Sequence, residues 1–124
     1  NVLISGAEHR PPDSIKVPDE MQRLVESHNK SNLHPVESAA RLHTDFVKVH
    51  PFVDGNGRTA RLLMNFELMR SGYLPVVIKA KDRLAYYDAL DTAHTKADYS
   101  SYIAMTVNIE ISILKTYLEL ISGT

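Results

Sequence analysis

Apolar positions recur three and four residues apart along most of the chain, which is typical of amphipathic α-helices. The clearest case follows His34, where Pro35 suits the first helical turn and buried-type residues then repeat through Val47. Because Pro51 disfavours helix at the residue before it, this helix should end near Val49. The pattern therefore predicts one helix from position 35 to about 49.

The same spacing predicts four further helices, at about 18–27, 58–71 and 81–96 and from about 98 onward. Pro18 suits a helix start, Gly72 a helix stop and Asp98 a helix cap. The helix at 58–71 is apolar on most sides, which is typical of a central, buried helix. Its apolar residues are Ala60, Leu62, Leu63, Met64, Phe66, Leu68 and Met69. The last helix should pack through Tyr102, Ile103, Thr106, Ile109, Ile113, Tyr117 and Leu120.

The N-terminal end departs from the helical pattern. Val2 to Ile4 form a β-friendly run, and Gly6 can turn the chain after it. Two consecutive prolines, Pro11 and Pro12, then block regular structure. We therefore predict an all-α helical bundle with a short β element at its N-terminus.

Composition narrows the class of protein. A chain of 124 residues, 44% hydrophobic and 23% charged, suits one globular domain. The net charge of -1 offers no broad basic surface, so no nucleic-acid partner is expected. No apolar stretch approaches the ~18 residues of a membrane span, so no membrane partner is expected either. The absence of cysteine excludes thiolate catalysis and cysteine-bound zinc. Because the chain does not begin with Met, we expect a fragment of a longer protein.

Residues 50–61 hold an unusual concentration of chemistry. Gly55 and Gly57 flank Asn56 just before a predicted helix, where their backbone amides can form an anion-binding concavity. The start of that helix adds unpaired N–H groups. Arg58 and Arg61 are three residues apart, so both project from the same side of the first turn and can reach phosphate oxygens.

Two further residues of this segment each fit two roles. Asp54 is either an ion-pair partner of one of the arginines or a ligand of Mg²⁺, which takes one or two carboxylates together with phosphate oxygens and water. His50 is either structural, as most single histidines are, or a proton acceptor near neutral pH. A histidine, a carboxylate, a glycine-bounded loop and two arginines within twelve residues favour the functional roles.

The segment HPFVDGNGRTAR, residues 50–61, resembles the Fic motif, His-x-Phe-x-Asp/Glu-Gly-Asn-Gly-Arg-x-x-Arg, at every specified position. The similarity extends over most of the chain. It includes the helix entry His34–Glu37, the segments Leu62–Asn65, Gly72–Tyr73 and Tyr86–Tyr87, and Val2–Pro12, which resembles the β-hairpin flap of the family. The resemblance implies a Fic catalytic core over residues 1–124, a helical bundle with a short flap, whose upstream region is missing.

The resemblance also implies a reaction: transfer of AMP from Mg-ATP to a Ser, Thr or Tyr hydroxyl of a target protein. His50 would be the catalytic base, and Asp54 would bind Mg²⁺. Residues Gly55, Asn56 and Gly57 would bind the α- and β-phosphates, Arg58 would orient the phosphate chain, and Arg61 would meet the γ-phosphate. Thr59 and Ala60 would complete this nucleotide-binding turn. Phe52 would be a buried anchor for the loop.

Two outlying groups of residues follow from the same resemblance. Tyr86 and Tyr87 would border the adenine pocket, although both also suit a helical core. His94 stands where related enzymes often carry an adenine-contacting Asn. The flap would pair with an extended segment of the target protein, and its residues Gly6, Ala7, Glu8 and His9 would approach the nucleotide. An ordinary terminal strand is the alternative for the flap.

The sequence allows several forms of regulation and several reaction types. Many Fic enzymes are inhibited by a helix with the pattern Ser/Thr-x-x-x-Glu-Gly/Asn. Thr106 to Glu110 fits only half of it, because Ile111 follows, so Glu110 is interpreted as a packing residue. An inhibitory helix would then lie in missing sequence or in a partner, or be absent. The alternatives to AMP transfer are removal of AMP, transfer of UMP, phosphate or phosphocholine, or a non-catalytic nucleotide-binding module. Family analogy implies a bacterial, cytoplasmic protein.

Overall fold

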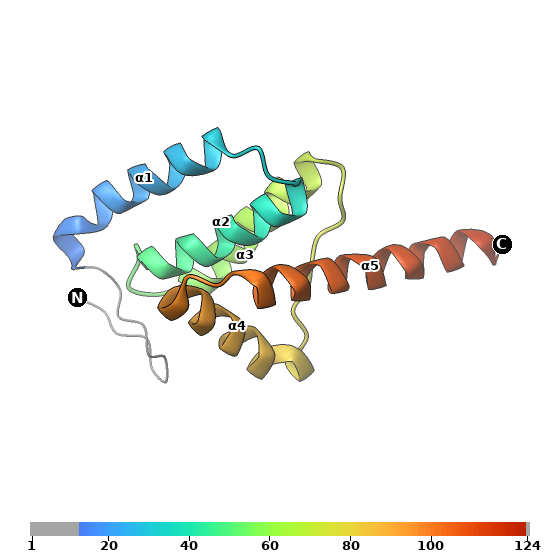
Figure 1. Cartoon of the computed structure of the whole chain (residues 1–124). Helices are drawn as coiled ribbons and strands as arrows, with labels where there is room; N and C mark the ends of the chain where they lie inside the picture. Colours follow the sequence, from blue (N-terminus) through green and yellow to red (C-terminus); the bar gives the residue numbers. More distant parts are fainter. Residues whose placement is uncertain (1–12, 124) are drawn as a thin grey trace.

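The computed structural model describes residues 13–123, and all of its regular elements in that range are helical. This confirms the predicted all-α bundle. The predicted flap, with Gly6, Ala7, Glu8 and His9, lies outside the described residues. The elements are a 3₁₀ turn η1 (Ser14–Lys16), α1 (Val17–Lys30), α2 (Pro35–Val49), α3 (Asn56–Arg70), a 3₁₀ turn η2 (Ala80–Asp82), α4 (Arg83–Lys96) and α5 (Ser100–Ser122) (Figure 1).

Helix α2 is the centre of the bundle and packs against α1, α3, α4 and α5. Its bounds are those predicted from the sequence. His34 caps its start, because the ring Nδ1 accepts a hydrogen bond from the backbone N–H of Val36 at 3.2 Å. Ala39 and Ala40 are fully buried, and such small side chains let neighbouring helices approach closely.

The prediction that α3 is buried on most sides was wrong. Its start also lies two residues earlier than predicted, at Asn56. Ala60, Met64 and Leu68 are fully buried on one face. The apolar side chains of Leu62, Phe66 and Met69 are exposed. The reason is that, in the described part of the chain, only α2 lies close along α3, while α4 and α5 reach it through the side chains of Tyr86 and Tyr102, so one face of α3 is covered.

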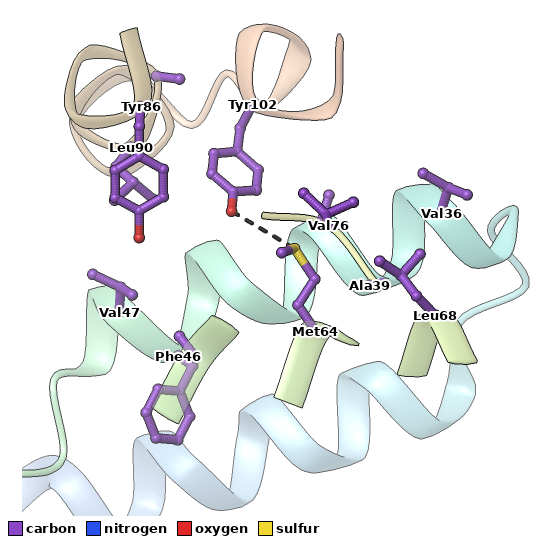
Figure 2. Close-up of a cluster of buried hydrophobic side chains, with 13 residues drawn as sticks. Val36, Ala39, Phe46, Val47, Met64, Leu68, Val76, Tyr86, Leu90 and Tyr102 are labelled. Carbon is purple, nitrogen blue, oxygen red and sulfur yellow. Dashed lines mark hydrogen bonds between the residues drawn. The ribbon is translucent and has the colours of Figure 1, made fainter. Parts of the chain in front are cut away.

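Two tyrosines attach α4 and α5 to this central pair. Tyr86 on α4 and Tyr102 on α5 both point toward α2 and α3 (Figure 2). The hydroxyl of Tyr102 donates to the sulfur of Met64 at 3.7 Å, and both side chains are fully buried. Burial of such large side chains contributes about 2 kcal/mol each and fixes α4 and α5 relative to α3.

The predicted packing stripe of α5 is correct only in its first half. The predicted cap lies one residue too early: the N-cap residue of α5 is Tyr99, and Asp98 before it accepts a hydrogen bond from the backbone N–H of Ser100 at 3.0 Å. Tyr102 and Thr106 are buried, but Tyr117 and Leu120 are exposed. The second half of α5 extends past the other helices (Figure 1). Among residues 13–123, α5 included, no helix combines the length and apolar content that crossing a bilayer requires.

The connection between α3 and α4 is held by two polar side chains. Asn65 forms two hydrogen bonds with the backbone of Val76, one to its N–H at 2.8 Å and one to its carbonyl at 3.1 Å. Glu110 is 3% exposed, and its Oε1 accepts from the N–H of Leu74 at 2.8 Å. This contact confirms that Glu110 is a packing residue of α5.

The Glu110 contact predicts a stability difference between two substitutions. Glu110→Ala leaves the Leu74 N–H without its acceptor, which should lower the free energy of unfolding by about 2 kcal/mol. Glu110→Gln keeps an acceptor oxygen and should lose less than half of that amount. Urea unfolding measures both, with Glu119→Ala on the exposed part of α5 as the control. Equal losses for the Ala and Gln variants would contradict the role of the hydrogen bond.

Candidate active site

His50 joins the central helix to the loop that carries the motif. It is the C-cap of α2, with φ 55° and ψ 59°, and its N–H donates to the carbonyl of Phe46 at 3.1 Å. This left-handed backbone conformation is uncommon for a residue with a side chain. Within residues 13–123 only Ala97 shares it among the non-glycine residues. The side chain is partly exposed, at the end of the most buried helix of the bundle.

Asn56 fixes the loop that follows. Its side chain is buried, its Oδ1 accepts from the N–H of Phe52 at 2.9 Å, and its Nδ2 donates to the carbonyl of Phe52 at 2.7 Å. The prediction that the Phe52 ring is the buried anchor was wrong, because Phe52 is 51% exposed and only tilts against Phe46 at 6.2 Å. The loop is held by the backbone of Phe52 and the amide of Asn56. Sequence spacing could not distinguish these two modes of attachment.

The first turn of α3 presents unpaired backbone N–H groups. Gly55 is the N-cap residue with φ 78°, and its carbonyl accepts the first helical hydrogen bond, from Thr59 at 2.9 Å. The amides of Asn56, Gly57 and Arg58 therefore precede the helical ladder and have no partner within α3. A helix start of this kind carries partial positive charge and attracts anions.

A pocket of about 390 Å³ lies over this helix start. It is lined by Val47, Asp54, Gly55, Asn56, Gly57, Arg58, Arg61, Tyr86, Tyr87 and Leu90. The structure thus brings most of the predicted nucleotide-binding residues into one concave surface, formed by α2, the loop, α3 and α4. Thr59, Ala60, His50 and His94 are not among the lining residues, and Ala60 is fully buried.

Asp54 lies at this pocket without an arginine partner. One of its oxygens, Oδ1, accepts from the N–H of Gly55 at 2.8 Å. Among the ion pairs of the described residues none joins Asp54 to Arg58 or Arg61. The ion-pair alternative for Asp54 is therefore not the arrangement seen. No group of three or more His, Asp or Glu side chains in the described region could by itself hold a metal ion.

Arg61 is held against α4 by a hydrogen-bonded chain. Its Nη1 donates to the hydroxyl of Tyr86 at 3.2 Å, and its guanidinium carbon lies 5.9 Å from the centre of that ring. The Tyr86 hydroxyl lies 3.0 Å from Nε2 of His43, which is fully buried on α2. The motif could not identify His43, which lies outside residues 50–61, and the available signal was its place on the buried stripe of α2.

Burial sets the charge states of the hydrogen-bonded side chains His43 and Tyr86. It lowers the pKa of His43 from 6.5 to about 3, with the positive charge of Arg61 and the neighbouring His94 acting in the same direction. Burial also raises the pKa of Tyr86, while Arg61 partly opposes that change. At neutral pH both His43 and Tyr86 are therefore uncharged, and Arg61 carries the positive charge at the pocket.

His94 lies on α4 and contacts the central helix. Its Nε2 donates to the backbone carbonyl of Thr44 at 2.8 Å. Because a carbonyl can only accept, this contact occupies one ring nitrogen of His94. The predicted contact of His94 with adenine stays a prediction.

A second, larger groove of about 1050 Å³ runs between α4 and α5. It is lined by residues such as Ala85, Met105 and Ile109, and it contains none of the motif residues. Size alone therefore does not identify the site, and the convergence of charged and backbone donors favours the smaller pocket.

Comparison with known proteins agrees with the geometry. Residues 1–68 match the model of the Fic/DOC family. The chain is 42% identical over 120 residues to a protein adenylyltransferase Fic from Drosophila sechellia, and equally to one from Drosophila melanogaster. These matches cover 94% of this chain but only 24% of each relative, so the chain spans about a quarter of their length.

Solved structures of Fic proteins have a similar fold. A Fic-domain signalling protein from Bacteroides thetaiotaomicron superimposes with a TM-score of 0.82 and 32% identity, covering 93% of this chain and 49% of that chain. Fic-1 from C. elegans superimposes with a TM-score of 0.77 and 34% identity, covering 88% and 33%.

Two glycines with positive φ, Gly55 and Gly72, allow the effect of backbone strain to be measured separately from the effect of a steric contact with Arg58. A Cβ at Gly55 would lie 3.0 Å from Nη2 of Arg58, whereas a Cβ at Gly72 would meet nothing within 4 Å. Both Gly55→Ala and Gly72→Ala should lose about 1–2 kcal/mol of unfolding free energy from the left-handed backbone. Only Gly55→Ala should also displace the Arg58 side chain, which a crystal structure of each variant would reveal. An undisturbed Arg58 in the Gly55 variant would contradict the contact.

The low pKa of His43 predicts a pH dependence of stability. Between pH 6.5 and about 3 the unfolded chain binds a proton at His43 that the folded chain excludes, so stability falls as the pH is lowered through this range. The slope from this group approaches about 1.4 kcal/mol per pH unit. His43→Gln removes the titrating ring but keeps a polar acceptor, so urea unfolding of this variant should depend less steeply on pH. Parallel pH profiles for the two proteins would contradict the buried neutral state.

Proposed function

This chain belongs to the Fic/DOC family, and on that premise we propose that it is the catalytic core of a protein adenylyltransferase. It would transfer AMP from Mg-ATP to a Ser, Thr or Tyr hydroxyl of a target protein and release pyrophosphate. The observation that carries the proposal is the single pocket in which the amides at the start of α3 converge with Arg58 and Arg61.

The pocket suits the phosphates of a nucleotide. The amides of the first turn of α3, which include those of Asn56 and Gly57, bind the inner phosphates. Gly57 leaves room for the Arg61 guanidinium beside this turn, since a Cβ at position 57 would lie 3.3 Å from Nη1 of Arg61. Arg58 orients the phosphate chain, and Arg61 meets the γ-phosphate. The neutral partners of Arg61, Tyr86 and His43, leave its positive charge available to that phosphate.

Asp54 is the residue that would hold Mg²⁺. Its carboxylate lies at the pocket, makes no ion pair with Arg58 or Arg61 among the described residues, and has one oxygen turned to the Gly55 N–H. A single carboxylate suits Mg²⁺ that arrives with its nucleotide, because this ion completes its octahedron with phosphate oxygens and water. When bound, the ion would neutralise charge on the phosphates of the leaving group.

His50 is the proposed general base. The hydroxyl oxygen of the target attacks the α-phosphorus of ATP, and its proton passes to the imidazole of His50. The bond between the α-phosphorus and the bridging oxygen of the β-phosphate breaks, and pyrophosphate leaves. His50 is the C-cap residue of α2, so it stands where α2 ends and the loop that leads to the phosphate-binding turn begins. Catalysis then depends mainly on positioning and charge stabilisation.

The adenine and the target protein occupy the outer parts of the site. Tyr87 is exposed and lines the pocket beside Tyr86, with their rings 5.3 Å apart, which supports the proposal that these two residues border the adenine. His94, which does not line the pocket, is the proposed counterpart of the family's Asn. The target would dock by an extended segment on the flap. We propose Mg-ATP as the substrate and, by family analogy, a cytoplasmic setting and a bacterial origin. The relatives named above come from flies, a nematode and a bacterium.

Labelled ATP tests the proposed reaction. We expect label at the α-phosphate to transfer to protein in a host lysate, and label at the γ-phosphate not to transfer. His50→Ala should lower transfer by at least about 100-fold, as loss of a general base does, while ATP binding changes little. His34→Asn, which removes another histidine but keeps a good helix cap, is the matched control and should transfer at the wild-type rate.

The same experiment distinguishes the alternatives. Transfer from the γ-position alone would indicate a kinase, and tight binding without transfer would indicate a nucleotide sensor. Full activity of His50→Ala would remove His50 from the role of base.

A further inference from the structure

We propose that His43 is a positioning residue for the nucleotide pocket, because through the Tyr86 hydroxyl it holds the Arg61 guanidinium at the pocket wall. The inference rests on the proposed function, in which Arg61 meets the γ-phosphate. It assigns a role to a residue outside the motif and outside the residues that line the pocket.

The chain of contacts crosses three helices. Arg61 on α3 bonds to Tyr86 on α4 at 3.2 Å, and Tyr86 lies 3.0 Å from Nε2 of His43 on α2. On its other side the Arg61 guanidinium is close to Gly57, where a Cβ would lie 3.3 Å from Nη1. The guanidinium is therefore confined between the first turn of α3 and the Tyr86 hydroxyl.

The chemistry of arginine determines which group donates and which accepts in the hydrogen bonds that join Arg61, Tyr86 and His43. A guanidinium has only donors, so the Tyr86 oxygen must accept from Arg61. The Tyr86 hydroxyl proton is then free to donate to His43, provided that Nε2 of His43 is an unprotonated acceptor. In that arrangement the Tyr86 oxygen is satisfied both as donor and as acceptor, and its position is fixed from both sides.

The tautomer of His43 follows from counting unsatisfied groups. Nδ1 of His43 has no hydrogen-bond partner among the described residues. With the proton on Nδ1, only that one group lacks a partner. With the proton on Nε2, both Nδ1 and the Tyr86 hydroxyl proton lack partners. A fully buried polar atom without a partner is costly, so the Nδ1-protonated form is favoured.

Packing alone does not explain a histidine at this position. Its ring stacks on Tyr102 with centroids 4.9 Å apart and an angle of 20°. A phenylalanine could make the same stack without leaving Nδ1 unsatisfied in the core. The one interaction that requires histidine is the bond from Tyr86 to Nε2, and its effect reaches the pocket through Arg61.

Burial keeps His43 able to accept. The low pKa of its ring, caused by burial and by the nearby Arg61 and His94, keeps the imidazole neutral at neutral pH, so that Nε2 is an acceptor in the Nδ1-protonated form. A charged His43 would instead donate toward Tyr86 and would place a second positive charge near Arg61. The electrostatics and the geometry thus favour the same state.

The first test needs no nucleotide. NMR of ¹⁵N-labelled protein should show a His43 ring protonated at Nδ1 and slow rotation of the Arg61 guanidinium. Tyr86→Phe and His43→Phe should each speed that rotation by about tenfold, the effect of losing one hydrogen bond. Tyr117→Phe, the same deletion at an exposed tyrosine on the second half of α5, should leave it unchanged. Unaltered rotation in the first two variants would overturn the inference.

The second test measures Mg-ATP and AMP binding by calorimetry. Tyr86→Phe and His43→Phe should weaken Mg-ATP binding by about tenfold but AMP binding by less than about twofold, because AMP lacks the phosphate that Arg61 meets. The double variant should be no weaker than either single variant. His43→Gln, which can place an acceptor oxygen near the site of Nε2, should restore most of the Mg-ATP affinity.

The outcomes separate this inference from the proposed function. Equal weakening of ATP and AMP binding would mean that His43 is only structural. Wild-type protein that binds no ATP would refute the proposed function, while the rotation of Arg61 would still decide the positioning role of His43.

Discussion

The pair of hydrogen bonds between the buried Asn56 amide and the backbone of Phe52 is the constraint on which the candidate site depends. These bonds hold the loop in register with the first turn of α3, and the left-handed Gly55 lets the chain enter that turn. As a result, the unpaired amides of the turn face a pocket rather than the core. An amide side chain is suited to this task because it donates and accepts at once.

The central position of α2 explains how one short loop can be so well defined. α2 ends at His50, where the loop begins, and it contacts every other major helix. Tyr86 and Tyr102 bring α4 and α5 against the α2–α3 pair. The far wall of the pocket, formed by Tyr86, Tyr87 and Leu90, is therefore attached to the same core as the loop. Rigid support of this kind is what positional catalysis requires.

Charge is distributed unevenly around Arg61. Its neighbours on the core side, Tyr86 and His43, are neutral at physiological pH. Asp54, the nearby carboxylate of the loop, makes no ion pair with it among the described residues. A guanidinium held by neutral partners keeps its full charge for an anion, whereas one paired with a carboxylate would have much of that charge compensated. The core thus positions this residue without neutralising it.

The sequence by itself determined the helices, the motif and the family. These depend on local periodicity, on helix start and stop residues, and on the order of a few residues within one short segment. The bounds of α2 were predicted, and so was the packing role of Glu110. Tertiary structure alone decided which helix is central, which face of α3 is covered, and that Asn56 rather than the Phe52 ring anchors the loop. It also decided that His43 meets Tyr86, since residues 43 positions apart become neighbours only when α2 and α4 pack together. Periodicity reports which side chains avoid water, but it carries no information about which helix supplies the partner.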